Sequence, residues 1–188
     1  MRTVEDALRF KDRLKKNDIK HAVVIGASMA GIKVVEVLHK YGIETWLLDL
    51  ASYIFPLAAY KEVAKEIEKR VEAQGVHLMF GVTIDHMEQE NGEKTAVLTD
   101  GSRIPADIVG LCIGTRAITE TVQGEVEIGR GIVVDDHMRT SVPGIYAAGD
   151  CCEGNNLESG QNQIIGLWAN ANHQGETAGI NMAGGDMA

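Results

Sequence analysis

Six residues between two apolar segments, five of them small, have the types and spacing needed to hold a phosphate-bearing ligand. They are Gly26, Ala27, Ser28, Met29, Ala30 and Gly31, and they follow the apolar stretch 21–25. The first glycine permits a sharp turn out of a strand, the middle small residue lets the backbone approach a pyrophosphate, and the last lets a helix pack closely. A helix that begins here offers free N–H groups to phosphates. Serine replaces glycine at the middle position; it is small enough, and its hydroxyl could donate to a phosphate oxygen.

An acidic residue lies where such a site needs one. Asp49 follows the apolar stretch 44–48 and stands 18 residues after Gly31, where a carboxylate can accept hydrogen bonds from ribose hydroxyls. Its charge would repel a 2′-phosphate, and residues 50–52 supply no arginine to neutralise one. The pattern therefore predicts a dinucleotide site that prefers NADH to NADPH. The alternative is a tight strand-to-helix turn that binds nothing.

A second pair of residues has the same kind of chemistry. Gly149 and Asp150 follow the apolar stretch 145–148, so a glycine admits close approach and a neighbouring carboxylate can accept hydrogen bonds from a polyol. A helix predicted over 168–182 would direct its N-terminal dipole at the electron-rich edge of a ring. Taken alone, Gly-Asp after a strand is usually only a turn.

The composition limits the class of protein. A chain of 188 residues with 45% hydrophobic residues can form one domain or two small ones. The net charge of −9 argues against nucleic acid or an anionic membrane surface as a partner. No apolar stretch approaches the roughly 20 residues that span a bilayer. The N-terminus has no apolar signal core, and the three cysteines form no disulfide framework, so a cytoplasmic protein is expected.

Hydrophobic periodicity and turn residues predict the elements that position these sites. Residues 3–6 resemble a capping box, and Pro56 is expected to open a helix that ends at Gly75. The charged residues of that helix are expected to form a solvated face: Glu62, Lys65, Glu66, Glu68, Lys69 and Arg70. Other helices are expected over 4–16, 29–41 and 168–182, strands over 21–25, 44–48, 76–80, 107–113, 131–134 and 143–148, a meander over 82–104, and a polar loop over 154–163. The strand 107–113 is expected to be buried and to rejoin the parallel sheet.

The ordered set of motifs resembles the pyridine nucleotide-disulfide oxidoreductase family, in the branch of NADH oxidases, nitrite reductases and coenzyme A-disulfide reductases. The matching segments are 2–7, 23–31, 113–116, 131–134, 139–143, 145–150 and 167–171. The resemblance implies that residues 26–31 surround the NAD pyrophosphate and nicotinamide end, that Asp49 holds the adenosine ribose, and that Gly114 approaches the nicotinamide. It implies that Gly149 and Asp150 hold FAD. The start of the last helix, at Ala169, would face the N1–O2 edge of the flavin.

The resemblance also sets the expected fold and function. The fold is α/β: a Rossmann-like NAD-binding domain with a parallel sheet and an antiparallel meander (20–118), preceded by a lead-in helix (1–19) and followed by the C-terminal half of an FAD-binding domain (119–188). The first half of the FAD domain and the C-terminal interface domain are expected to be absent. The implied function is hydride transfer from NADH to FAD and on to an unidentified acceptor; the alternative is an NAD-binding or structural fragment without turnover. A homodimer is a further expectation, and neither a metal site nor a catalytic acid, base or nucleophile is predicted.

Overall fold

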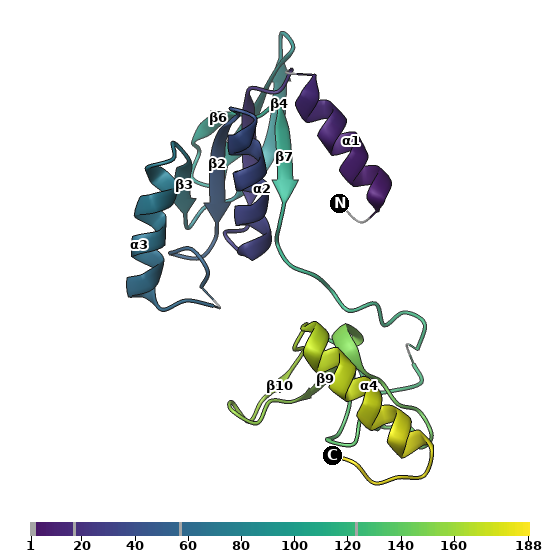
Figure 1. Cartoon of the computed structure of the whole chain (residues 1–188). Coiled ribbons are helices and arrows are strands. Elements are labelled where there is room, and N and C mark those ends of the chain that lie inside the picture. Colours follow the sequence, from purple (N-terminus) through teal and green to yellow (C-terminus); the bar gives the residue numbers. More distant parts are fainter. Residues whose placement is uncertain (1–2, 17, 57, 123) are drawn as a thin grey trace. The chain divides into compact units, whose positions relative to one another are not determined.

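The computed structural model describes residues 3–16, 18–56, 58–122 and 124–188, and it divides into two compact units, 1–114 and 115–188. Figure 1 shows the elements of both units along the chain.

A four-stranded parallel sheet forms the centre of the first unit. Its strand order is β3-β2-β1-β7, with β3 at His77–Phe80, β2 at Glu44–Asp49, β1 at His21–Ile25 and β7 at Ile108–Leu111. The return of β7 beside β1 confirms the expectation for that segment. Because all four strands run in one direction, their carboxyl ends meet at one edge of the sheet, where α/β proteins bind ligands.

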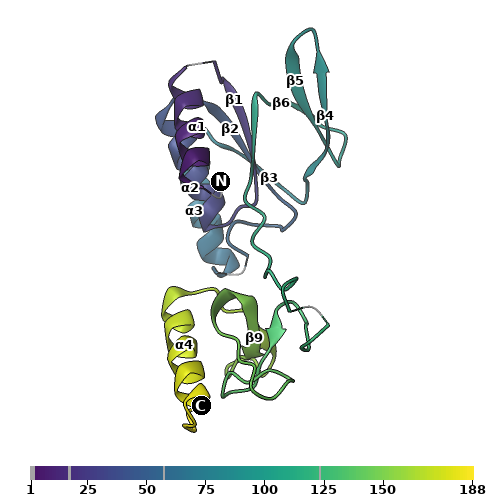
Figure 2. The ribbon, with the colours of Figure 1, turned by 90° about the vertical axis from the view of Figure 1, so that its right-hand side faces the viewer.

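Helices cover one face of this sheet and a meander covers the other, as Figure 2 shows. The helices are α1 (Val4–Lys15), α2 (Met29–Lys40) and α3 (Lys61–Glu72). The predicted capping box is present at α1, where Thr3 accepts from the N–H of Asp6 and the Asp6 carboxylate accepts from the N–H of Thr3. The core beneath the helices includes Val24, Leu47 and Ile54.

The meander consists of β4 (Ile84–Glu90), β5 (Glu93–Leu98) and β6 (Arg103–Pro105), paired antiparallel in that order. Asn91 and Gly92 join β4 to β5 with positive φ angles of 50° and 88°, which is the geometry of a two-residue hairpin turn. Val23, Leu48 and Leu98 belong to the core between the meander and the sheet. Alternating residues of β1 and β2 thus supply both cores, as strand geometry requires.

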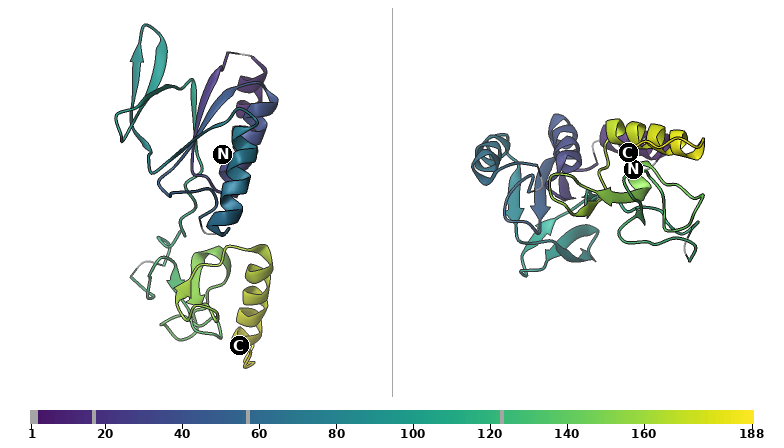
Figure 3. Two further views of the ribbon diagram at one scale, coloured as in Figure 1. Left: turned by 90° about the vertical axis from the view of Figure 1, so that its left-hand side faces the viewer. Right: turned by 90° about the horizontal axis from the view of Figure 1, so that it is seen from below.

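The second unit is smaller and contains short strands and one long helix. Strands β8 (Ile132–Val133), β9 (Cys152–Asn155) and β10 (Asn162–Gln163) form a sheet in the order β10-β9-β8, and η1 (Gly149–Cys151) is a single 3-10 turn. Helix α4 spans Trp168–Met182, as predicted, and lies along the strands of its own unit in Figure 3.

Three predicted elements are wrong. Helix α3 begins at Lys61 rather than at Pro56, because its N-cap Tyr60 has extended backbone angles (φ −68°, ψ 148°), which interrupt a helix. Residues 143–148 form no strand, because their ladder contacts amount to one isolated bridge between Arg139 and Tyr146. The segment 154–163, expected to be a loop, contains the end of β9 and all of β10.

Candidate nucleotide-binding sites

The loop after β1 requires glycine at both of its ends. Gly26 has a φ of 106°, and a Cβ there would lie 2.3 Å from the carbonyl oxygen of Cys112. A Cβ on Gly31 would lie 1.9 Å from the carbonyl oxygen of Gly26. Both distances are far below van der Waals contact, so α2 can begin this close to β1 and β7 only with glycine at these positions.

Helix α2 presents free donors at its N-terminus. Within the part of the chain that the structure describes, the backbone N–H groups of Ser28, Met29 and Ala30 have no protein acceptor. Met29 and Ala30 are exposed. Unpaired N–H groups at a helix N-terminus bind anions, so this loop fits the pyrophosphate of a dinucleotide.

The Ser28 hydroxyl is directed into the protein. It accepts from the N–H of Gly31 and donates to the carbonyl oxygen of Cys112, each across 3.4 Å. Ser28 is therefore the N-cap of α2, with extended backbone angles. The expectation that this hydroxyl donates to a phosphate does not match its contacts here.

We expect Ser28→Ala to lower the free energy of unfolding by about 1 kcal/mol, since it removes the cap of α2. NADH affinity should change by less than about threefold, because the donors at the helix N-terminus are backbone groups. Thermal or urea unfolding and a titration with NADH measure the two effects. A loss of affinity without a loss of stability would show instead that the hydroxyl contacts the ligand.

The Asp49 carboxylate lies beside this loop at the end of β2. Its Oδ2 accepts from the N–H of Ala27 at 2.7 Å, and its Oδ1 accepts from the N–H of Ala51 at 2.8 Å. Each oxygen keeps a second lone pair, so the carboxylate can also accept from ribose hydroxyls. Asp49 therefore joins the two loops that a dinucleotide would contact.

Glu68 makes a contact in this region that the sequence did not predict. Its Oε1 accepts from the N–H of buried Ile54 at 3.0 Å, and the next N–H, that of Phe55, donates to the carbonyl oxygen of Ala27 at 2.9 Å. The prediction of a purely solvated face on α3 is thus wrong at Glu68. Helical periodicity places Glu68 near the apolar stripe but carries no information about the loop it reaches.

Exposed apolar side chains gather among the segments at the carboxyl edge of the sheet. They are Met29, Leu50, Leu111 and Ile113, and the last two are 68% and 72% exposed. The expectation that the strand 107–113 is buried is therefore wrong: residues 107–110 are half-buried and Leu111 and Ile113 are exposed, because β7 is an edge strand of the sheet. Gly114 follows with a φ of 96° and open space around its Cβ position, so its backbone angle is what favours glycine.

In the second unit, α4 holds the Gly149 turn. The N–H of Gly149 donates to Oε1 of Gln174 at 2.9 Å, and a Cβ on Gly149 would lie 3.4 Å from the Cβ of Ala171. Gly149 has a φ of 82°. The sequence contains no local signal for the role of Gln174, because Gln174 and Gly149 are 25 positions apart.

The Asp150 carboxylate is exposed and has no hydrogen-bond partner among the described residues. It lies against Gly166, where a Cβ would be 3.5 Å from its Oδ2. Helix α4 begins two residues later without a side-chain cap, and the N–H groups of Trp168, Ala169 and Asn170 have no protein acceptor in the described chain. An unpaired carboxylate and a free helix N-terminus fit the polyol and the electron-rich ring edge of a flavin.

Two of the three thiols, those of Cys112 and Cys152, are not activated as nucleophiles. Burial raises the pKa of the Cys152 thiol to about 11, and burial also raises the pKa of Cys112. A thiol must ionise to attack, so both remain unreactive near neutral pH.

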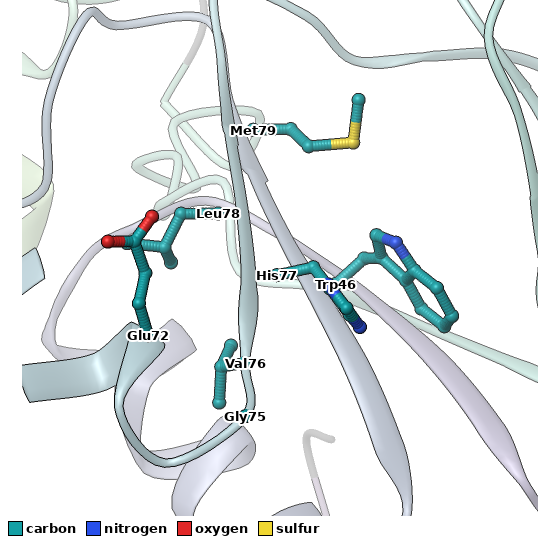
Figure 4. A pocket seen from close by; sticks show the side chains of 7 residues that line it. All are labelled: Trp46, Glu72, Gly75, Val76, His77, Leu78 and Met79. Atoms are coloured by element: carbon teal, nitrogen blue, oxygen red, sulfur yellow. The ribbon is translucent and has the colours of Figure 1, made fainter. Parts of the chain in front are cut away.

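A hollow of about 450 Å³ lies away from these loops, at the amino ends of β2 and β3 (Figure 4). Trp46 stacks on His77 with ring centroids 4.7 Å apart, and Nε2 of His77 is 2.9 Å from Oε1 of Glu44. In Figure 4, Met79 and Trp46 lie on one side of β3, whereas Leu78 and Glu72 lie on the other. The hollow therefore follows the edge of the sheet and contains none of the predicted site residues.

Neither a metal-binding cluster nor a membrane-spanning helix occurs among the described residues. No group of three or more His, Cys, Asp or Glu residues is arranged to hold a metal ion. No helix combines the length and the apolar character needed to cross a membrane.

Comparisons with known proteins bear on the whole chain. The family model described as pyridine nucleotide-disulphide oxidoreductase matches residues 1–175. An NADH oxidase of Streptococcus pyogenes is 30% identical over 179 residues, which are 93% of this chain and 39% of the relative. The chain thus spans about two fifths of the length of such curated relatives.

Solved structures give the same result. The water-forming NADH oxidase of Lactobacillus brevis bound to NADH matches 96% of this chain and 40% of its own, with a TM-score of 0.87 and 28% identity. A mutant of that enzyme with five substitutions, an engineered NADPH oxidase bound to NADPH, matches 99% of this chain and 41% of its own, with a TM-score of 0.88 and 26% identity. Together with the two glycine-based sites, these matches show that the chain belongs to the pyridine nucleotide-disulphide oxidoreductase family.

Proposed function

We propose that this chain supplies the NADH-binding domain and part of the FAD-binding domain of a flavin-dependent oxidoreductase, which passes hydride from NADH to FAD and on to an acceptor. Residues 20–118 would bind NADH, and residues 119–188 would contribute to FAD binding after the lead-in helix of residues 1–19. The observation that carries the proposal is the exposed N-terminus of α2, where free N–H groups stand beside the Asp49 carboxylate.

The NADH site takes its parts from three segments of the first unit. Residues 26–31 would hold the pyrophosphate through backbone N–H groups, since Gly26 and Gly31 let α2 begin close to β1 and β7. The Asp49 carboxylate would accept from the adenosine ribose. Gly114 would approach the nicotinamide, with Leu111 and Ile113 as exposed apolar neighbours in sequence.

A preference for NADH over NADPH follows from charge. A 2′-phosphate would meet the Asp49 carboxylate, and the next residue is the uncharged Leu50. The engineered NADPH oxidase offers a parallel, because its substitutions include an aspartate-to-alanine change followed directly by an alanine-to-arginine change. In that protein, one acidic residue is removed and two arginines are added.

FAD would be held by the second unit. Asp150 would accept from the ribityl chain, and the free N–H groups at the start of α4, including that of Ala169, would face the N1–O2 edge of the flavin. Gly149 gives the turn its shape, and Gln174 holds that turn on α4. The bound flavin supplies the capacity to accept hydride, and the protein contributes position and electrostatics.

The alternative is a binding module without turnover. The chain spans 39% of the NADH oxidase, and in this alternative it binds NADH without forming an FAD site. In that case, the NADH site of the first unit would still bind its ligand.

Purification of the chain, followed by anaerobic titration with NADH, tests the proposal. A yellow protein whose flavin absorbance is bleached by NADH is the expected result. Colourless protein that binds NADH favours the binding module. Absence of NADH binding, measured by calorimetry or fluorescence, would contradict both functions.

A further inference from the structure

Helix α3 contacts the loop that follows Asp49 through one carboxylate. Oε1 of Glu68 accepts from the N–H of Ile54 at 3.0 Å, and the Ile54 side chain is fully buried. A backbone N–H at a buried residue needs an acceptor, and Glu68 supplies it from another element. This hydrogen bond therefore fixes the position of the loop 50–55 relative to α3.

The same loop is joined to the phosphate-binding segment through both backbone polar groups of Ala27. The N–H of Ala27 donates to Asp49, and the carbonyl oxygen of Ala27 accepts from the N–H of Phe55. Phe55 has a φ of 55°, a conformation uncommon for an aromatic residue, so it needs support from its neighbours. Its neighbour Ile54 is the residue that Glu68 holds.

We propose that Glu68 is a positioning residue for nucleotide selectivity: it holds the loop 50–55 so that Asp49 and Leu50 face the adenosine ribose. The inference rests on the proposed NADH site. Glu68 acts through the Ile54 N–H and the Phe55–Ala27 bond, and it does not itself touch the nucleotide. Its effect should therefore appear in the contrast between NADH and NADPH, because the two ligands differ only at the ribose.

Three variants separate this role from a general loss of structure. Glu68→Met keeps the length of the side chain but removes the acceptor, whereas Glu68→Gln keeps an oxygen that accepts from Ile54. Glu66→Met is the matched control on the same helix, where the native carboxylate forms exposed ion pairs with Lys69 and Arg70. Dissociation constants for NADH and NADPH, with amide hydrogen exchange at Ile54 and Phe55, are measured for each.

In Glu68→Met, we expect the NADH dissociation constant to rise about tenfold, NADPH binding to change less than about twofold, and exchange at Ile54 and Phe55 to accelerate. Glu68→Gln and Glu66→Met should stay within about twofold of the native chain for both ligands. Equal weakening of NADH and NADPH in Glu68→Met would overturn the proposal, and so would a Glu68→Gln variant as impaired as Glu68→Met. A native chain that binds no NADH overturns the proposed function, whereas native-like selectivity in Glu68→Met overturns the role of Glu68 alone.

Discussion

Replacing Gly31 with alanine is expected to abolish NADH binding and to lower the free energy of unfolding by about 3 kcal/mol. The added Cβ would lie 1.9 Å from the carbonyl oxygen of Gly26, which is backbone and cannot rotate away. Helix α2 would have to move from β1, and the free N–H groups at its start would move with it. Chemical unfolding and an NADH titration measure the two losses.

Gly175→Ala is the control for this substitution. Gly175 lies inside α4 with nothing within 4 Å of its Cβ position, so alanine there should leave stability unchanged or raise it by up to about 1 kcal/mol. If Gly31→Ala kept native stability and native NADH affinity, the close approach of α2 to the Gly26 turn would be contradicted.

Replacing Asp49 changes which nucleotide is preferred. We expect Asp49→Ala to weaken NADH binding by about 10- to 100-fold and NADPH binding by less, because the carboxylate that accepts from the ribose would repel a 2′-phosphate. The double variant Asp49→Ala, Leu50→Arg should bind NADPH more tightly than NADH, since an arginine can pair with the phosphate. Equilibrium titration of each variant with both nucleotides measures the preference.

Asp49 also accepts hydrogen bonds from the N–H groups of Ala27 and Ala51, so its replacement requires a control for loop structure. Asp49→Asn removes the charge but retains one acceptor oxygen, enough for one of the two N–H groups, so it should relax the discrimination against NADPH with a smaller loss of stability than Asp49→Ala. Equal loss of NADH and NADPH affinity in Asp49→Ala would contradict the ribose assignment and indicate that Asp49 serves only to join the two loops.

Local patterns predicted the regular elements of this chain well. The apolar strand His21–Ile25 and the helix Trp168–Met182 occur with their predicted bounds, and the capping box at Thr3 is formed. Such features depend on residues a few positions apart. The helix expected from Pro56 begins later, at Lys61, because the N-cap Tyr60 has an extended backbone. Bonds from Phe55 to Ala27 and from Ile54 to Glu68 hold the loop that precedes it.

For the candidate sites too, the sequence predicted one part and only the tertiary structure decided the other. From the sequence alone, residues 26–31 and Asp49 predicted a dinucleotide site, because residue type and spacing decide what a backbone turn can approach. The resemblance to the family added a flavin at Gly149 and Asp150. Tertiary structure alone decided that the Ser28 hydroxyl caps a helix, that Glu68 reaches Ile54 and that Gln174 holds Gly149. The physical reason is that a side-chain hydrogen bond depends on where two separate segments meet. Helical or strand periodicity defines a residue's face but not the partner that the fold brings to it.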